Sequence, residues 1–120
     1  MINVVLVAIG GALGAVLRYI ISIQVTPTQN GFPLATLLIN VLGAFLIGLL
    51  SALSLKFGLD SRLVTLLQTG VLGGFTTFST FALETVSLIE GDKWPLALLY
   101  MVLSLVLSIV AVIISHVLIK

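Results

Sequence analysis

Hydroxyl groups recur every four residues in the last apolar stretch of the chain, at Tyr100, Ser104 and Ser108. Residues at this spacing share one face of a helix. Small residues favour close helix packing in a membrane, and serines can bond back to their own helix, but packing does not need a continuous ladder of hydroxyls. Because O–H groups can donate hydrogen bonds to an anion, the ladder is a candidate ion path.

Asn40 is a second polar residue in an apolar setting, in the interior of another stretch and on one helical face with Thr36 and Gly48. An amide without hydrogen-bond partners in an apolar medium costs several kcal/mol. Asn40 is therefore either a tie between helices or part of a permeation site, and its spacing does not distinguish the two.

Arg18 and Glu84 are ionisable groups inside apolar stretches, where such residues face a cavity, a partner or the interface. Arg18 either extends to the lipid headgroups or supplies a positive charge to an aqueous vestibule that attracts anions. Glu84 either pairs at the interface or gates the vestibule. His116 is the one histidine, and its place near the C-terminus favours an interfacial residue over a ligand or base.

The segment from Gly70 to Phe81 is the most informative part of the chain. Gly73 and Gly74 are followed by Phe75 and then by threonines and a serine, which form helices less readily than alanine. We therefore predict a helix that unwinds at its centre, with an unbroken helix as the alternative. Unwound carbonyls can hold a cation in a membrane protein. The segment has no acidic side chain, so the cation would be a hard ion such as Na⁺ held by backbone oxygens.

The same segment offers hydrogen-bond donors, from freed N–H groups and from the hydroxyls of Thr76, Thr77, Ser79 and Thr80. No ring of carboxylates is present to favour cations, so the donors favour an anion. Phe78 and Phe81 lie three residues apart, and the edge of a phenyl ring is positive. Their edges could line an anion path, although ordinary core packing explains the two rings as well.

Four apolar stretches must position these residues within one domain, 1–120. Of the 120 residues, 60% are hydrophobic and 8% charged, against about 25% charged in a typical soluble domain. Lipid must therefore be the solvent for most of the chain, whose mean hydropathy is +1.36. A membrane helix needs about 20 apolar residues, and the predicted spans are Ile2–Ile23, Leu34–Leu55, Leu63–Ile89 and Pro95–Leu118. The expected fold is all-α, with four transmembrane helices and the third broken in mid-membrane.

Composition also excludes several classes of function. No cluster of Lys and Arg could grip phosphates, so we expect no nucleic acid partner. Cysteine is absent, which rules out disulfides and thiolate sites. The four acidic residues lie near the ends of the spans, so no nucleophile, base and orienting acid can be assembled, and we expect no enzyme.

The charges near the ends of the spans give a weak orientation signal. An even number of spans places both termini on one side, with Lys56, Arg62 and Lys120, while the other side has Lys93 and, near the end of the first span, Arg18. The side richer in Lys and Arg stays in the cytoplasm. This small bias permits insertion in both orientations and thus an antiparallel dimer, unless packing or a single charge fixes one orientation.

Three motifs resemble the Fluc (CrcB-type) fluoride channel family. They are Gly10–Tyr19 (GGALGAVLRY), Ala35–Gly48 (ATLLINVLGAFLIG) and the highly specific Gly73–Phe81 (GGFTTFSTF). With the matching length and span count, the resemblance covers essentially the whole chain. Ala35 stands where the family often has glycine, and we expect no functional consequence from this difference.

The resemblance implies a passive fluoride channel, assembled as an antiparallel homodimer or paired heterodimer with two pathways. Asn40 would donate to the ion, Phe78 and Phe81 would line the path with their edges, and Ser79 and Thr80 would supply the hydroxyls of the break. The hydroxyl track of the last helix would be Tyr100, Ser104 and Ser108.

The resemblance further implies a structural Na⁺ on the two-fold axis, held by the backbone carbonyls of Gly73 and Thr76 from both subunits. That cation would lower the electrostatic cost of admitting an anion. All three motifs are intact, which favours a homodimer. The expected role is fluoride resistance: fluoride leaves the cytoplasm of a prokaryote through its plasma (inner) membrane, down the electrochemical gradient.

Two alternatives are a small multidrug exporter and a non-conducting assembly subunit. The exporter needs a carboxylate in its first helix, and the first span here has none. The assembly subunit explains the glycines but leaves Asn40 and the hydroxyl ladder without a role.

Overall fold

The computed structural model describes all 120 residues; the linker 25–33 joins the first two helices, and shorter turns join the others. Four stretches are long and apolar enough to cross a membrane, namely Ile2–Gln24, Leu34–Phe57, Ser61–Glu90 and Trp94–Ile119. The all-helical architecture with four such helices is therefore confirmed. The elements in chain order are α1 (Ile2–Gln24), α2 (Leu34–Phe57), α3 (Ser61–Val64), the π-helix η1 (Thr65–Leu72), α4 (Gly73–Phe75), α5 (Phe78–Glu90) and α6 (Trp94–Ile119).

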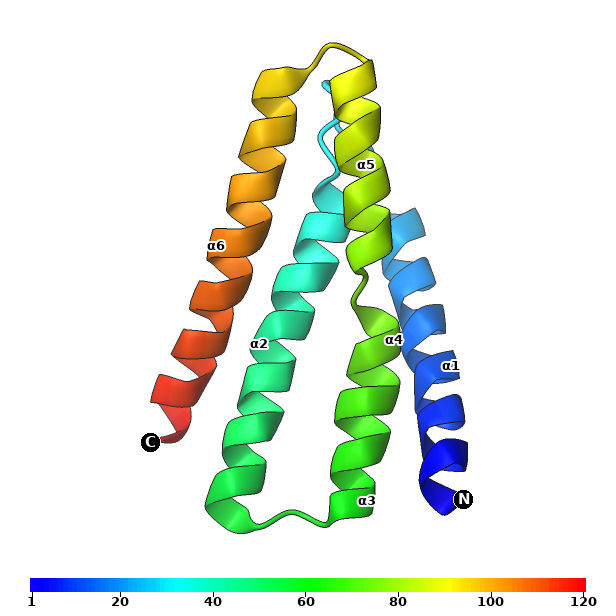
Figure 1. The fold of residues 1–120 in the computed structure, drawn as a ribbon, viewed down its shortest axis with the longest axis vertical. Helices are drawn as coiled ribbons and strands as arrows, with labels where there is room; N and C mark the ends of the chain where they lie inside the picture. The colour runs from blue at the N-terminus through cyan, green and yellow to red at the C-terminus, as the bar shows by residue number, and fades with distance from the viewer.

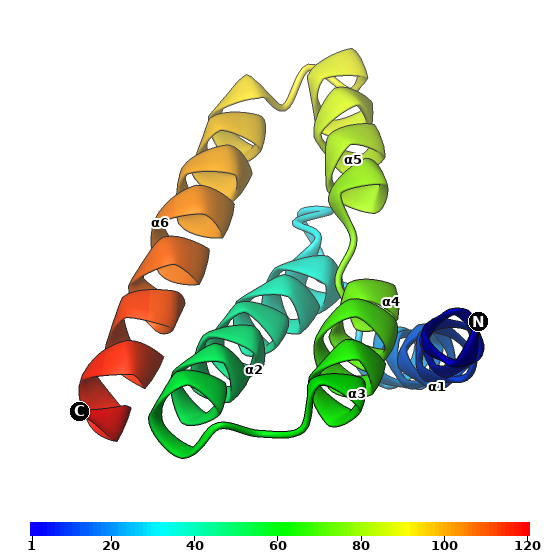
Figure 2. The ribbon, with the colours of Figure 1, turned by 60° about the horizontal axis from the view of Figure 1, so that its bottom comes forward.

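The third span, which comprises α3, η1, α4 and α5, changes its packing partner along its length. Its first half, η1 and α4, packs against α1, while α5 packs against α6, and α6 also packs along α2. Both chain termini lie at one end of the molecule (Figure 1), and α1 and α6 lie on opposite sides of it (Figure 2). The third span therefore connects the α1 side of the molecule to the α6 side.

Local sequence explains where the connections fall. Gly58 adopts the left-handed conformation (φ 63°, ψ 51°) that ends α2, a backbone shape that favours glycine. Asp60 then caps the next helix, because its side-chain oxygen accepts the Arg62 N–H at 2.8 Å. Pro95 occupies the first turn of α6, where its missing N–H costs no helical bond.

The third span departs from α-helical geometry at two places. Thr65–Leu72 forms a π-helix, a feature that we did not predict. The backbone then becomes extended at Thr76 (φ −87°, ψ 156°) and Thr77 (φ −149°, ψ 124°), which we call the interruption. Gly73 and Gly74 remain helical, so the unwinding lies beyond the glycine pair and not at it.

The position of the interruption follows the threonines because Thr77 begins a new helix. Its Oγ1 accepts the Thr80 N–H at 3.2 Å, which is the bond of an N-cap residue. Glycine permits unwinding but does not require it. Gly74 instead serves close packing, since a Cβ there would lie 2.6 Å from the Gly11 carbonyl oxygen of α1.

The glycines of α1 let its backbone touch that of the third span. A Cβ on Gly10 would lie 2.9 Å from the Gly70 Cα, and one on Gly14 would overlap the Val71 carbonyl oxygen. Gly10 and Gly14 are both buried. Gly10-x-x-x-Gly14 is therefore a close-packing motif of α1.

We expect Gly14→Ala to destabilise the protein by about 1–3 kcal/mol, because the new methyl group would displace one backbone from another. The matched control is Gly11→Ala, since no atom lies within 4 Å of a Cβ at that position. The midpoint of thermal unfolding in detergent should fall for the first variant only. Equal midpoints would contradict the close α1 contact.

Most of the molecular surface is apolar. Only 16 of 120 residues are buried, and the core cluster contains just Leu37, Leu88, Ala97 and Tyr100. Such an exposed apolar surface is incompatible with water. Lipid or a partner chain must cover it.

Candidate functional site

A groove of about 340 Å³ opens beside the interruption, between α2, α5 and α6. Five of the predicted pathway residues line it, from three helices: Asn40, Phe78, Phe81, Ser104 and Ser108. The lining also includes Thr76 and Thr77 of the interruption and contains no charged side chain. Residues distant in sequence thus line one groove, which is mostly apolar and carries a few polar side chains.

Asn40 holds the interruption to α2 with a pair of hydrogen bonds. Its Nδ2 donates to the Thr77 carbonyl oxygen at 2.9 Å, and the Thr77 N–H donates to its Oδ1, also at 2.9 Å. The structure therefore shows Asn40 as a tie between elements. An amide nitrogen has two hydrogens, so the second remains available to an occupant of the groove.

Ser79 and Thr80 lie in the first turn of α5 but do not line the groove. Their hydroxyls surround the Thr77 hydroxyl, which donates to Thr80 Oγ1 at 3.1 Å and lies 3.5 Å from Ser79 Oγ. These side chains stabilise the start of α5 in the single chain.

The aromatic rings form a continuous series from the groove into the core. The Phe78 and Phe81 ring centroids are 5.6 Å apart, and those of Phe81 and Tyr100 are 5.1 Å apart. Phe78 is 76% exposed, whereas Tyr100 is fully buried. The Phe78 ring therefore lines the groove while most of its surface stays exposed in the single chain.

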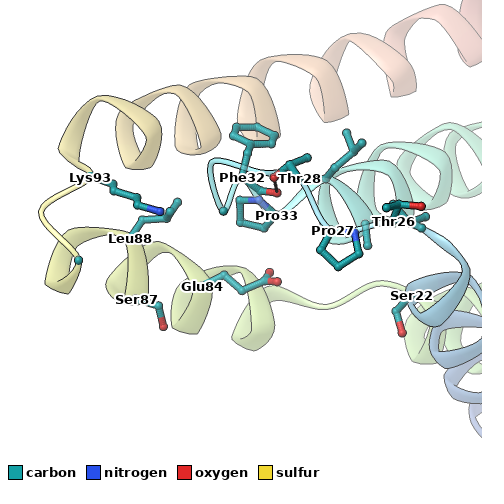
Figure 3. A pocket seen from close by; sticks show the side chains of 15 residues that line it. Ser22, Thr26, Pro27, Thr28, Phe32, Pro33, Glu84, Ser87, Leu88 and Lys93 are labelled. Carbon is teal, nitrogen blue, oxygen red and sulfur yellow. Dashed lines mark hydrogen bonds between the residues drawn. The ribbon is translucent and has the colours of Figure 1, made fainter.

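Tyr100 lies outside the groove lining, although we predicted it as part of the hydroxyl track. Its hydroxyl donates to Glu84 Oε1 at 3.0 Å. Glu84 in turn lines a separate pocket of about 460 Å³ between α5 and the linker 25–33, with Lys93 at its margin. Figure 3 shows Glu84 extending from α5 into this space. Because it is open and its lining includes the charged Glu84 and Lys93, this pocket is a candidate vestibule.

Arg18 does not line that pocket. Its Nε donates to the Gly74 carbonyl oxygen at 3.2 Å, in a partly buried contact between α1 and α4. The residue that we predicted as a vestibule cation is thus in contact with the backbone just before the interruption.

Two carbonyl groups beside the interruption lack their helical partners. In a continuous helix, Gly73 O would accept from the Thr77 N–H and Thr76 O from the Thr80 N–H. Those N–H groups instead donate to Asn40 Oδ1 and Thr77 Oγ1. Backbone oxygens suit a hard cation, and no group of three or more His, Cys, Asp or Glu could hold a metal. The Gly73 and Thr76 carbonyls are the two that the resemblance to the fluoride channel family implies as Na⁺ ligands, and their role in binding the ion stays a prediction.

The Ser104 hydroxyl oxygen is buried and has no hydrogen-bond partner in the chain. An unsatisfied buried polar group costs about 1–3 kcal/mol. An ion or water in the adjacent groove would provide the missing hydrogen bond. Ser104 is therefore the lining residue whose hydroxyl most needs an occupant of the groove.

Ser104→Ala should leave the thermal unfolding midpoint unchanged or raise it, because it removes that unsatisfied group. If the groove conducts anions, flux through reconstituted protein should fall severalfold. Ser115→Ala is the control, since the Ser115 hydroxyl already donates to the Val112 carbonyl oxygen at 2.7 Å and does not line the groove. Lower stability with unchanged flux in Ser104→Ala would contradict this assignment.

Three features of the site were missed from the sequence: the cap at Thr77, its pairing with Asn40, and the contact between Arg18 and Gly74. Threonine is a common N-cap residue, so the cap at Thr77 could have been found, although Thr80 and not Glu or Gln stands three residues later. The other two depend on backbone positions that no side-chain pattern specifies.

Comparison with known proteins identifies the family. Residues 5–116 match the family described as CrcB-like protein, Camphor Resistance (CrcB). A relative from Ruminiclostridium cellulolyticum, named fluoride-specific ion channel FluC, is 49% identical over 100% of this chain and 94% of its own length. Relatives of the same name come from Agrobacterium fabrum (48% identity, 93% of this chain and 91% of the relative) and Saccharophagus degradans (44%, 93% and 85%). The resemblance read from the three sequence motifs is therefore confirmed, and the chain belongs to the CrcB-like protein family.

Proposed function

We propose that the chain forms a passive channel for fluoride. The observation that carries this proposal is the groove beside the interruption, which gathers Asn40, Phe78, Phe81, Ser104 and Ser108 without any carboxylate. Relatives that cover nearly the whole chain are named fluoride-specific ion channels. The site and the family therefore support the same function.

The chemistry of the groove suits a small, strongly hydrated anion. Hydrogen-bond donors must replace the water that fluoride loses, and the second Nδ2 hydrogen of Asn40 and the hydroxyls of Ser104 and Ser108 are placed to do so. Phenyl edges add weak positive potential. Discrimination by donors and bore size needs no moving part, so a channel is sufficient.

The interruption stands near the middle of the 30-residue third span. This placement supports a break at mid-membrane depth, because a bilayer core is about 30 Å thick. Non-helical backbone is tolerated there only beside protein or water. A partner chain and a hydrated ion path would supply both.

A second copy of the chain would complete the pathway. Phe78 is 76% exposed, and Gly73, with its carbonyl free of a helical partner, is also exposed. The proposed homodimer is antiparallel, since the two ends of the molecule differ little in Lys and Arg. Two chains would also supply four carbonyls, from Gly73 and Thr76 of each, to a structural Na⁺ on the dimer axis.

The antiparallel arrangement can be tested by labelling, because the chain has no cysteine. Ser61 is exposed and begins α3, and α3 lies at the end of the molecule that has the termini (Figure 1). Ser61→Cys in cells or oriented vesicles should react about half on each side with a membrane-impermeant thiol reagent. Labelling from one side only would exclude insertion in both orientations.

Passive conduction can be separated from coupled export by ion flux from liposomes. Fluoride efflux should require a K⁺ ionophore to balance charge and should need no proton gradient. Efflux driven by a proton gradient, or competition by a lipophilic cation, would favour the multidrug exporter. In the bacterial inner membrane, passive flux would carry fluoride out of the cytoplasm whenever the internal concentration and membrane potential favour exit.

A further inference from the structure

The contact between Arg18 and Gly74 suggests a role for this arginine beyond its charge. Arg18 Nε donates to the Gly74 carbonyl oxygen at 3.2 Å, and the contact is partly buried. Gly74 faces α1 so closely that a Cβ there would lie 2.6 Å from the Gly11 carbonyl oxygen. The guanidinium therefore meets the backbone at a tight helix–helix contact and not in open water.

Side chains of neighbouring helices donate hydrogen bonds to some carbonyls around the interruption and leave other carbonyls without a donor. Arg18 of α1 donates to the Gly74 carbonyl oxygen, and Asn40 of α2 donates to the Thr77 carbonyl oxygen. The carbonyls of Gly73 and Thr76 lose their helical N–H partners to Asn40 and to the Thr77 hydroxyl. The free carbonyls are thus flanked by carbonyls that are held in place.

We propose that Arg18 is a positioning residue for the cation site: by holding the Gly74 carbonyl against α1, it keeps the Gly73 and Thr76 carbonyls available to an alkali cation. This inference rests on the sodium site proposed above. It differs from a vestibule role, in which only the positive charge of Arg18 would matter.

The physical basis is the cost of an unpaired carbonyl. Without a donor from α1, the Gly74 carbonyl would be unsatisfied in a partly buried contact, which is unfavourable. Rotation of its peptide plane towards another donor would turn the neighbouring Gly73 peptide as well. The Gly73 carbonyl would then be displaced as a ligand of the cation, and cation affinity would fall.

Three substitutions separate the donor of Arg18 from its charge. Glutamine has an N–H group as many bonds from Cα as Arg18 Nε, but it is neutral. Lysine keeps the charge and has a methylene at that position. Methionine has neither feature, and because all three are unbranched at Cβ they fit a helix.

The experiment measures thermal unfolding of the full-length protein in detergent against Na⁺ concentration, with ionic strength held constant by an organic cation. For Arg18→Lys and Arg18→Met, the Na⁺ concentration that gives half of the stabilisation should rise about tenfold, whereas Arg18→Gln should stay within about twofold of the unmodified chain. A merely structural role would lower stability equally at every Na⁺ concentration and leave this midpoint in place.

Hydrogen exchange gives a second readout that needs no ion flux. The Thr77 N–H, which donates to Asn40, should exchange faster in Arg18→Lys and Arg18→Met but not in Arg18→Gln. If lysine behaves like the unmodified chain, if glutamine behaves like methionine, or if neither lysine nor glutamine allows assembly, the proposal is wrong.

Failure of this inference is distinguishable from failure of the sodium site or of the channel. If the unmodified chain shows no Na⁺ dependence, the sodium site fails and this inference fails with it, while fluoride flux is a separate measurement. If the unmodified chain responds to Na⁺ but the Na⁺ midpoint of Arg18→Gln is the same as those of Arg18→Lys and Arg18→Met, only the role of Arg18 is overturned. A pure vestibule charge would give the opposite order in fluoride flux, with lysine active and glutamine inactive.

Discussion

Asn40→Asp is expected to reduce fluoride flux about a thousandfold. A carboxylate about 4 Å from an anion raises its energy by about 4 kcal/mol at an effective dielectric constant of 20, which corresponds to about three powers of ten in rate. The change also removes the donor to the Thr77 carbonyl oxygen, now 2.9 Å from Asn40 Nδ2. Fluoride efflux from liposomes measures the effect directly.

Asn30→Asp is the matched control for this substitution. Asn30 uses only its side-chain oxygen, which accepts the Phe32 N–H at 3.0 Å, and an aspartate can make the same bond. Flux should therefore stay near that of the unmodified chain. Strong flux in Asn40→Asp would show that the Asn40 amide does not face the ion.

Phe78→Ile is expected to lower fluoride flux at least tenfold while changing stability by less than about 1 kcal/mol. The ring is 76% exposed and contacts Phe81 at a centroid distance of 5.6 Å, and aromatic pairs contribute about 0.5–1.5 kcal/mol. Isoleucine keeps the apolar bulk but has no positive edge to present to an anion. Paired measurements of flux and unfolding midpoint separate the two effects.

Phe57→Ile provides the comparison for Phe78, because it is also an exposed phenylalanine, at 66%, and lies at the end of α2 away from the groove. Its flux should match that of the unmodified chain. If Phe78→Ile conducts as well as Phe57→Ile, the ring does not line the path.

The four spans could be predicted from the sequence because each is a run of apolar residues with polar breaks. Hydropathy reports such runs directly, and the predicted bounds differ from the structural ones by two residues or fewer. The close contact at Gly14 was also predictable, since small residues four apart have few other roles in lipid.

The details of the third span could not be predicted in the same way. Gly73, Gly74 and Thr77 are all weak helix formers and all permit unwinding. The position of the interruption depends on the tertiary contacts that each residue makes. Gly74 is needed for contact with α1, while Thr77 gains a cap and a pairing with Asn40. The π-helix Thr65–Leu72 has no strong local signal.

The candidate site was predicted at the level of residue types and only in part at the level of contacts. Hydroxyl spacing placed Ser104 and Ser108 on one face, and both line the groove. The same spacing included Tyr100, but its ring is buried against that of Phe81 and its hydroxyl donates a hydrogen bond to Glu84. Helical spacing gives a common face but does not say where along that face a groove ends.

The central claim is that donors beside the interruption replace the hydration of fluoride, and halide efflux tests it most directly. Purified protein in liposomes with a K⁺ ionophore should release fluoride rapidly and chloride at the rate of protein-free vesicles. Release of the two halides at equal rates, or of neither above that background, would contradict the account.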